Sequence, residues 1–286
     1  MTTSLELHQS LWAMEDLPDR WDAVSLERRV ALVADAGYTG VVVDLGARQA
    51  PEAAALAPLL ADAGLTGGVL IFARTDDDID RALRYADRIG ADWIICCARI
   101  FGLDPRPLAH TITDWYERCV RAGIDMQLET HRDTVTNDLR FTVALLELLD
   151  SRIEVAADLS HYVCAHEIPE RPSPEYDEPI SRVLARAGSL QGRIATRAQI
   201  QVPLDHPMSA PWTERFEGWW REGFASIRRQ HPQRPVRFVT ELGTTPYAIV
   251  DRNGVQVSDR WAESLALMNM ARKAFASSTA FEGAHR

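Results

Sequence analysis

The chain has 286 residues, 46% of them hydrophobic, and a formal net charge of −10, as expected for a globular chain with a sizeable core. The acidic balance argues against a nucleic-acid partner, because phosphate backbones are bound by clustered Lys and Arg. Its single lysine, Lys273, lies in the last predicted helix, so we do not expect a Schiff-base mechanism at a strand end.

Eight short apolar runs alternate with amphipathic stretches along the chain. The predicted strands are residues 5–8, 40–45, 67–72, 93–98, 125–130, 153–159, 194–201 and 236–242. The predicted helices are residues 26–36, 77–88, 110–122, 139–149, 180–187, 213–229 and 259–275. Repeated βα units predict an α/β protein with a closed (β/α)8 TIM barrel, formed as a single domain over residues 1–286. An open doubly wound sheet is the alternative, which the lack of a GxGxxG motif after the first strand weakens.

The cysteines and the N-terminal segment predict the compartment. The four cysteines form no CxxC pair, and Cys96 and Cys97 are adjacent in an apolar run, so we expect reduced thiols. No basic segment followed by an apolar stretch opens the sequence, and no run of about 18 apolar residues occurs. We therefore expect a cytoplasmic protein without a membrane partner.

Polar groups that can bind a hard cation end four successive predicted strands: Glu129, Asp158, Gln199 and Glu241. Each has an ordinary alternative as an ion-paired carboxylate, a helix cap or a hydrogen-bonded amide. Consecutive strands of a barrel bring their carboxyl ends to one mouth, however, where these oxygens would form a site for Mg²⁺ or Mn²⁺. Gln201 and His206 are the alternatives to Gln199 as the fourth ligand.

The segments LETHRD, DLSH, AQIQVP and TELG, in this order on successive strands, resemble the xylose isomerase-like TIM barrel superfamily of sugar isomerases and epimerases. The resemblance implies one divalent metal held by a Glu, the Asp of a DxxH motif, a His or Gln, and a last-strand Glu. The strand-seven segment is similar to hydroxypyruvate isomerases, in which Gln replaces His. DNA-repair endonucleases of the superfamily use several histidines, which the third, fourth and seventh predicted strands lack.

The resemblance implies that Glu129 and Glu241 are both metal ligands and the catalytic acid/base pair. The expected reaction is isomerisation or epimerisation of a small keto-sugar, polyol or hydroxy acid through a metal-stabilised enediolate. A dehydratase or lyase on the same scaffold is the first alternative, and a specialised biosynthetic or non-catalytic relative is the second.

Further polar and aromatic residues near the predicted strand ends are candidates for substrate contacts. An ion pair is the alternative for the arginine, and support of the metal ligands is the alternative for the histidine of the DxxH motif. The expected partners are a small-molecule substrate and a second copy of the chain in a homo-oligomer. The candidate substrate-binding residues are His161, Arg197, His131, His8 and Trp12.

Overall fold

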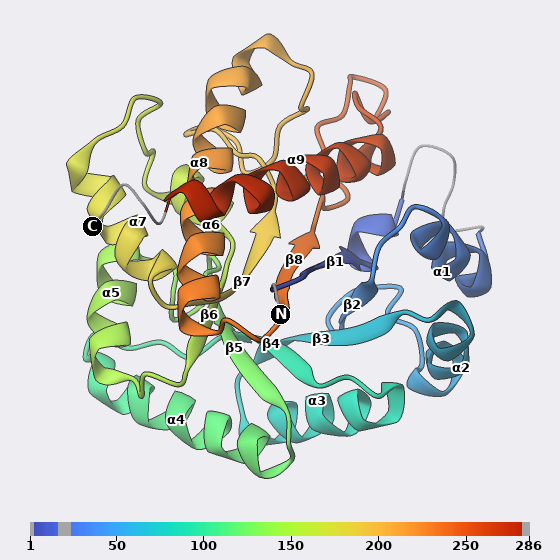
Figure 1. The fold of residues 1–286 in the computed structure, drawn as a ribbon, viewed down its shortest axis with the longest axis horizontal. Helices are drawn as coiled ribbons and strands as arrows, with labels where there is room; N and C mark the ends of the chain where they lie inside the picture. Colours follow the sequence, from blue (N-terminus) through green and yellow to red (C-terminus); the bar gives the residue numbers. More distant parts are fainter. Residues whose placement is uncertain (1–2, 17–23, 282–286) are drawn as a thin grey trace.

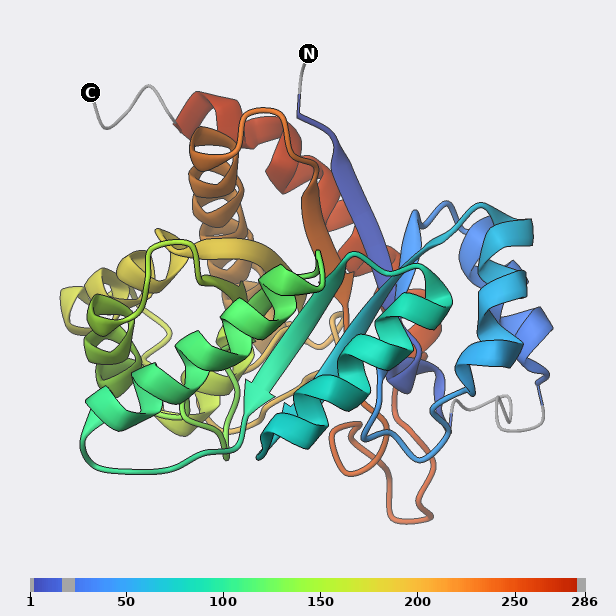
Figure 2. The ribbon, with the colours of Figure 1, turned by 90° about the horizontal axis from the view of Figure 1, so that it is seen from below.

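The computed structural model describes residues 3–16 and 24–281, and its strands close into a parallel barrel in chain order, which confirms the predicted (β/α)8 TIM-barrel class. Figure 1 looks along the barrel, with the helices around the strands, and Figure 2 shows it from the side. The strands are β1 (Leu5–Ser10), β2 (Gly40–Asp44), β3 (Thr66–Ala73), β4 (Trp93–Ala98), β5 (Asp125–Glu129), β6 (Glu154–Ala157), β7 (Ala187–Gly192) and β8 (Val236–Thr240).

The helices pack around the barrel and cover its outer face. The described helices are α1 (Leu26–Asp35), α2 (Ala53–Ala63), α3 (Asp76–Ile89), α4 (Pro105–Arg121), α5 (Leu139–Leu148), α6 (Leu159–Ala165), α7 (Pro174–Leu184), α8 (Ala210–Gln230) and α9 (Arg260–Phe281), with 3-10 turns η1 (Trp12–Met14) and η3 (Pro207–Ser209). Among the described residues, no helix combines the length and the apolar character needed to cross a bilayer.

Side chains alternate between the outer and inner faces of each strand, so two apolar clusters form. The larger one lies between strands and helices, and a smaller one fills the barrel interior around Trp93, Leu70, Ile95 and Val239. On β8, the inward series that contains Val239 continues two residues later at Glu241. The same alternation on each strand decides which side chains reach the mouth.

The predicted position of strand seven is wrong. The strand is Ala187–Gly192, and most of the predicted segment 194–201 is an irregular stretch after it. The sequence AGSLQG has little intrinsic strand preference, but its glycines fit a crowded interior, because an added Cβ at Gly188 would lie 2.2 Å from Glu154 Oε2. Packing thus overrides local preference, and the polar groups of strand seven move relative to the mouth.

Several helices also differ from expectation: α6 (Leu159–Ala165) was not predicted, and α4 begins at Pro105, before the predicted helix 110–122. The chain forms α2, which was not predicted, with Pro58 inside it and a left-handed Gly64 after its end. The predicted helix 180–187 is observed as α7, which begins earlier, at Pro174, a residue type favoured in the first helical turn.

Candidate active site at the barrel mouth

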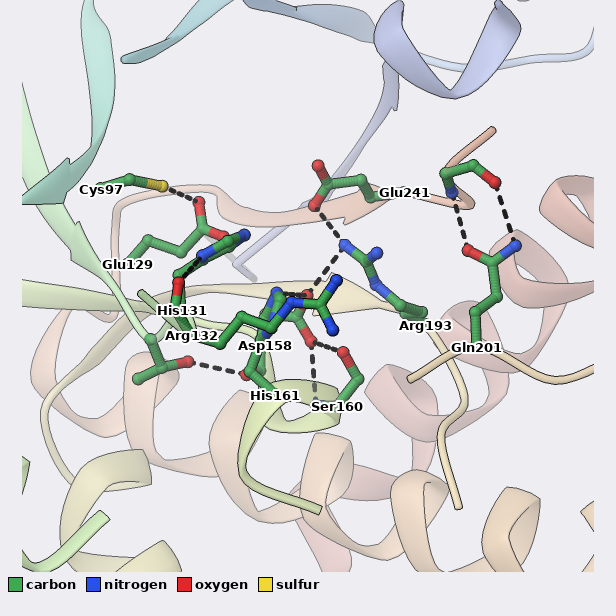
Figure 3. Close-up of polar contacts among 12 residues, drawn as sticks. Cys97, Glu129, His131, Arg132, Asp158, Ser160, His161, Arg193, Gln201 and Glu241 are labelled. Atoms are coloured by element: carbon green, nitrogen blue, oxygen red, sulfur yellow. Dashed lines mark hydrogen bonds and ion pairs between the residues drawn. The ribbon is translucent and has the colours of Figure 1, made fainter. Parts of the chain in front are cut away.

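Three of the four predicted metal ligands meet at the carboxyl ends of the strands (Figure 3). Glu129 ends β5, Asp158 caps α6 directly after β6, and Glu241 follows β8. All three are buried, and each offers an oxygen within 4.8 Å of the others. Glu129 accepts a hydrogen bond from Cys97 Sγ (3.2 Å), and Asp158 Oδ1 accepts one from the Ser160 amide (2.9 Å).

The two glutamates are both easier to protonate than in water. Burial raises the pKa of Glu129 well above its usual value, and the negative charges of Glu241 and Asp158 raise it further. Burial also raises the pKa of Glu241, to about 8, although the Arg193 guanidinium opposes that shift. The mouth is therefore acidic and crowded, with carboxyl groups able to hold protons near neutral pH.

Arg193 is the main functional candidate that the sequence-based prediction missed. It continues the inward-facing series Ser189, Gln191, Arg193 along β7 and beyond its end. Its Nη2 lies 3.1 Å from Asp158 Oδ2 and 3.2 Å from Glu241 Oε2 (Figure 3). With the strand assigned to 187–192, side-chain alternation alone would have identified this arginine.

Aromatic rings hold the Arg193 guanidinium in place. It lies 4.9 Å from the ring centroid of Tyr247 and 5.9 Å from that of Trp12. The side chain is about 1% exposed, yet its Nε and Nη1 find no acceptor among the described residues. A buried guanidinium with free N–H groups is costly unless another molecule accepts their hydrogen bonds.

Gln199 does not join the carboxylates, which corrects its prediction as a metal ligand. It lies in the exposed segment after β7 and lines a separate cavity together with His206, one of the two alternative ligands. The other alternative, Gln201, is buried, but its amide donates to the Gly243 carbonyl (3.1 Å) and accepts from the Gly243 amide (2.7 Å). All three departures follow from the shifted position of strand seven.

His131, His161 and Trp12 lie near the carboxylates, as expected for substrate contacts. The rings of His131 and His161 are 3.9 Å apart between centroids, and His161 Nε2 is 3.5 Å from Asp158 Oδ2. Burial lowers the pKa of His131 to about 4 and that of His161 well below its usual value. Both imidazoles are therefore neutral at pH 7, when each ring can donate one hydrogen bond and accept another.

His8 and Arg197 are corrected, because neither lies at the mouth. His8 points into the lower barrel, edge-on to Trp93 with centroids 5.3 Å apart and 3.1 Å from Thr66 Oγ1. It comes too early on β1 to reach the strand ends. Arg197 is exposed and pairs with Glu167 at 3.1 Å, the ordinary alternative for this residue.

A cavity of about 430 Å³ opens over the carboxylates, in the range of small-molecule sites. Residues at the ends of strands and in the loops after them complete its wall, and the sequence did not single these out because they lack a motif. They include Asp44, Arg48, Phe72, Thr244 and Tyr247. Burial raises the pKa of Asp44 to about 6, so the wall contains another carboxyl group that titrates near neutral pH.

Two sets of side chains have spacing that could hold a metal ion: Glu129, Asp158 and Glu241, or Glu129, His131 and His161. An ion bound at about 2.1 Å to the free oxygens of Asp158 and Glu241 would lie only about 3 Å from the Arg193 guanidinium. Charges of +2 and +1 at that separation repel by roughly 10 kcal/mol at an effective dielectric constant of 20. The spacing of the first set is thus consistent with a divalent ion, but the Arg193 guanidinium competes with such an ion for the oxygens of Asp158 and Glu241.

The second set shares Glu129 and substitutes two neutral imidazoles for the other acids. The charge of Arg193 acts on this set as well, since it contributes to the lowered pKa values of both His131 and His161. Arg193 is thus a cation of the chain itself, in contact with Asp158 and Glu241 and close enough to act on the imidazoles of the second set.

No family model matches this chain, and no curated protein sequence matches it. Solved structures do match. A D-allulose 3-epimerase from Methylomonas sp., in complex with D-allulose, is 15% identical with a TM-score of 0.60, covering 97% of this chain and 100% of that one. A xylose isomerase-like TIM barrel protein from Mycobacterium smegmatis, in complex with magnesium, is 14% identical with a TM-score of 0.58, covering 96% and 100%.

A third match is a probable 3-DHS dehydratase from Bacillus anthracis, 12% identical with a TM-score of 0.60, covering 93% of this chain and 99% of that one. At these identities the likeness concerns the fold. The chain has the fold of the xylose isomerase-like TIM barrels, which include epimerases, isomerases and a dehydratase.

Proposed function

We propose that the protein is an isomerase or epimerase that moves a proton on a small hydroxy-carbonyl compound, such as a keto-sugar or a hydroxy acid. One observation carries the proposal: two buried carboxyl groups, Glu129 and Glu241, lie in different electrostatic surroundings beside one small cavity. Acid/base catalysis needs such a pair, with one group protonated and the other ionised. The epimerase with the same fold, solved with D-allulose, supports the substrate class.

The surroundings assign the two roles. Burial raises the pKa of Glu241 to about 8, but the Arg193 guanidinium, 3.2 Å away, lowers it, so Glu241 is the more easily ionised of the two glutamates and is the base. Glu129 contacts the Cys97 thiol instead, and no described cation forms an ion pair with it, so it keeps its proton and is the acid.

The reaction then balances without an outside reagent. The Glu241 carboxylate removes the proton from the carbon between the carbonyl and hydroxyl groups, and the C–H electron pair moves into a C=C bond as the carbonyl oxygen takes up charge. In epimerisation Glu129 gives its proton to the opposite face of the same carbon, and the C=C electron pair forms the new C–H bond as the C=O bond is restored. In isomerisation the proton goes to the neighbouring carbon instead, and the former hydroxyl oxygen becomes the new carbonyl as it passes its proton to the former carbonyl oxygen. Proton exchange with solvent returns Glu241 and Glu129 to their starting states. The negative oxygen needs N–H donors, and a divalent ion, the cofactor predicted from the sequence, is not part of this proposal.

Proton NMR in D2O of a panel of ketoses and keto acids tests the proposal. Incorporation of deuterium beside the carbonyl, without loss of water, is the expected result. Loss of water would point to the dehydratase alternative instead. If no compound of the panel exchanges while it measurably binds, the proposed proton transfer is wrong.

A further inference from the structure

A positive side chain occupies the centre of the carboxylate cluster, where the related fold would suggest an ion. Arg193 Nη2 reaches Asp158 and Glu241 at 3.1 and 3.2 Å, and these contacts use one corner of the guanidinium. These contacts are ion pairs, and neither carboxylate oxygen accepts a hydrogen bond from the described residues. The arginine therefore provides positive charge to the oxygens that would have to ligate a metal.

The position of Arg193 is fixed from several directions. The alternation along β7 directs the side chain inward, and Tyr247 and Trp12 contact its guanidinium at 4.9 and 5.9 Å between its carbon and the ring centroids. Trp12 in turn packs edge-on against Tyr247, with centroids 5.2 Å apart. An arginine held this way keeps its place without the entropy cost that weakens exposed ion pairs.

The N–H groups of Arg193 that do not contact the carboxylates are available for a ligand. Nε and Nη1 are buried without an acceptor among residues 3–16 and 24–281, and Arg193 lines the cavity that Glu129 and Glu241 also line. The Nε and Nη1 N–H groups lie on different edges of the guanidinium, and each can donate a hydrogen bond to a carbonyl, enediolate or carboxylate oxygen.

We propose that Arg193 is the resident cation of this mouth: it keeps divalent ions out, and its free N–H groups bind the oxygen that becomes negative in the reaction. The first part stands on geometry alone, and the second part rests on the proposed function. Arg193 is thus a catalytic residue for the proposed chemistry, in the role that a metal ion has in a metal-dependent barrel.

Metal binding tests the first part without any substrate. The purified protein is titrated with Mn²⁺ and, separately, Mg²⁺, and followed by the electron paramagnetic resonance signal of free Mn²⁺ and by thermal unfolding. The unmodified chain is expected to leave Mn²⁺ free and to unfold at an unchanged temperature. One tightly bound ion per chain, either purified with the protein or acquired in the titration, would overturn the proposal.

The variant Arg193→Ala removes the cation and leaves three carboxylates together. It is expected to bind Mn²⁺ at least ~10²-fold more tightly than the parent, because a nearby unit of positive charge is gone. Saturating Mn²⁺ should raise its unfolding temperature by about 5 °C. Arg193→Lys keeps the charge and should still exclude the ion, which provides a folded test if the alanine variant fails to fold.

Arg197→Ala is the matched control, since Arg197 follows β7 too but is exposed and paired with Glu167. It should neither bind Mn²⁺ nor change activity. Failure of Arg193→Ala to bind Mn²⁺ more tightly than this control, or binding of Mn²⁺ by Arg193→Lys, would refute the ion-excluding role.

The second part is tested with a substrate identified by deuterium exchange. Arg193→Lys is expected to lower kcat by about 10²–10³-fold with a smaller change in KM. The reason is that lysine lacks the Nε and Nη1 N–H groups that would donate to the substrate oxygen as it becomes negative. An unchanged kcat would overturn this role. Failure to find any substrate would count against the proposed function alone, because the Mn²⁺ result does not depend on turnover.

Discussion

The carboxyl groups at the two ends of the barrel differ in how they are paired with positive charges. At the end where the strands begin, Glu154 is paired with both His231 and Arg234, the latter at 2.6 Å. Arg237 contacts both oxygens of Asp92 at 2.9 Å. Arg237 also contacts Glu6 at 3.4 Å, so the charges at this end are matched by nearby partners, and such pairs hold the strands in register.

At the end where the strands finish, three buried carboxyl groups lie near one guanidinium, which contacts two of them. Glu129 has no ion-pair partner among the described residues, while Arg193 divides its contact between Asp158 and Glu241. A surplus of buried negative charge costs stability, and proteins accept that cost mainly at functional sites. The difference between the ends identifies the mouth as the place of chemistry more strongly than any single residue does.

The largest expected effect is on activity at the mouth. Glu241→Gln removes the proposed base and should lower the rate of substrate deuterium exchange by about 10²–10⁴-fold. Glu263→Gln, a half-buried carboxylate at the start of α9 that is remote from the cavity, should leave the rate unchanged. Equal rates for both variants would remove Glu241 from the mechanism.

The second expected effect is a pH-dependent change in stability at Asp44, whose folded pKa is about 6 and therefore above the usual 3.8. The folded state binds this proton more tightly than the unfolded state, so the stabilisation is complete below pH 3.8 and is lost as the pH rises through 6. Relative to the parent, Asp44→Asn should gain about 2–3 kcal/mol in free energy of unfolding between pH 4 and 7. Urea unfolding at several pH values measures the gain, and a difference that is constant with pH would contradict it.

The third effect contrasts neutralisation at the two ends. Glu154→Gln leaves His231 and Arg234 without their partner and should lower the free energy of unfolding by about 2 kcal/mol, a figure reduced for the partial exposure of both partners. Glu129 is protonated, so Glu129→Gln replaces one neutral group by another of the same shape and should leave the free energy of unfolding unchanged within about 1 kcal/mol. Thermal unfolding compares the two. If Glu129→Gln proved the more damaging change, the contrast between the ends would not hold.

The smallest expected effect belongs to the segment after β7. The double variant of Arg197→Ala and Gln199→Ala should change KM by less than about two-fold and stability by less than about 0.5 kcal/mol, as for ordinary surface positions. Steady-state kinetics on the identified substrate measures the first quantity. A large rise in KM would restore these residues to the substrate site.

The sequence predicted the barrel and three of its mouth residues because βα alternation and acids at apolar strand ends are local patterns. Glu129, Asp158 and Glu241 needed no knowledge of packing. Strand seven could not be found in this way, since AGSLQG becomes a strand only where neighbouring side chains leave space for its glycines. Because of that shift, Arg193 lies at the mouth in place of Gln199. A positive charge therefore stands where the sequence predicted a metal ligand.

The double hydrogen bond between the Gln201 side chain and the Gly243 backbone joins the loops that follow β7 and β8. Arg193 and Glu241 stand at the bases of these two loops, so a displacement of one loop is transmitted to the other. We expect the guanidinium and its glutamate to keep their spacing as thermal motion deforms the rim. A ligand would then meet a preformed recess and lose little affinity to rearrangement of the protein.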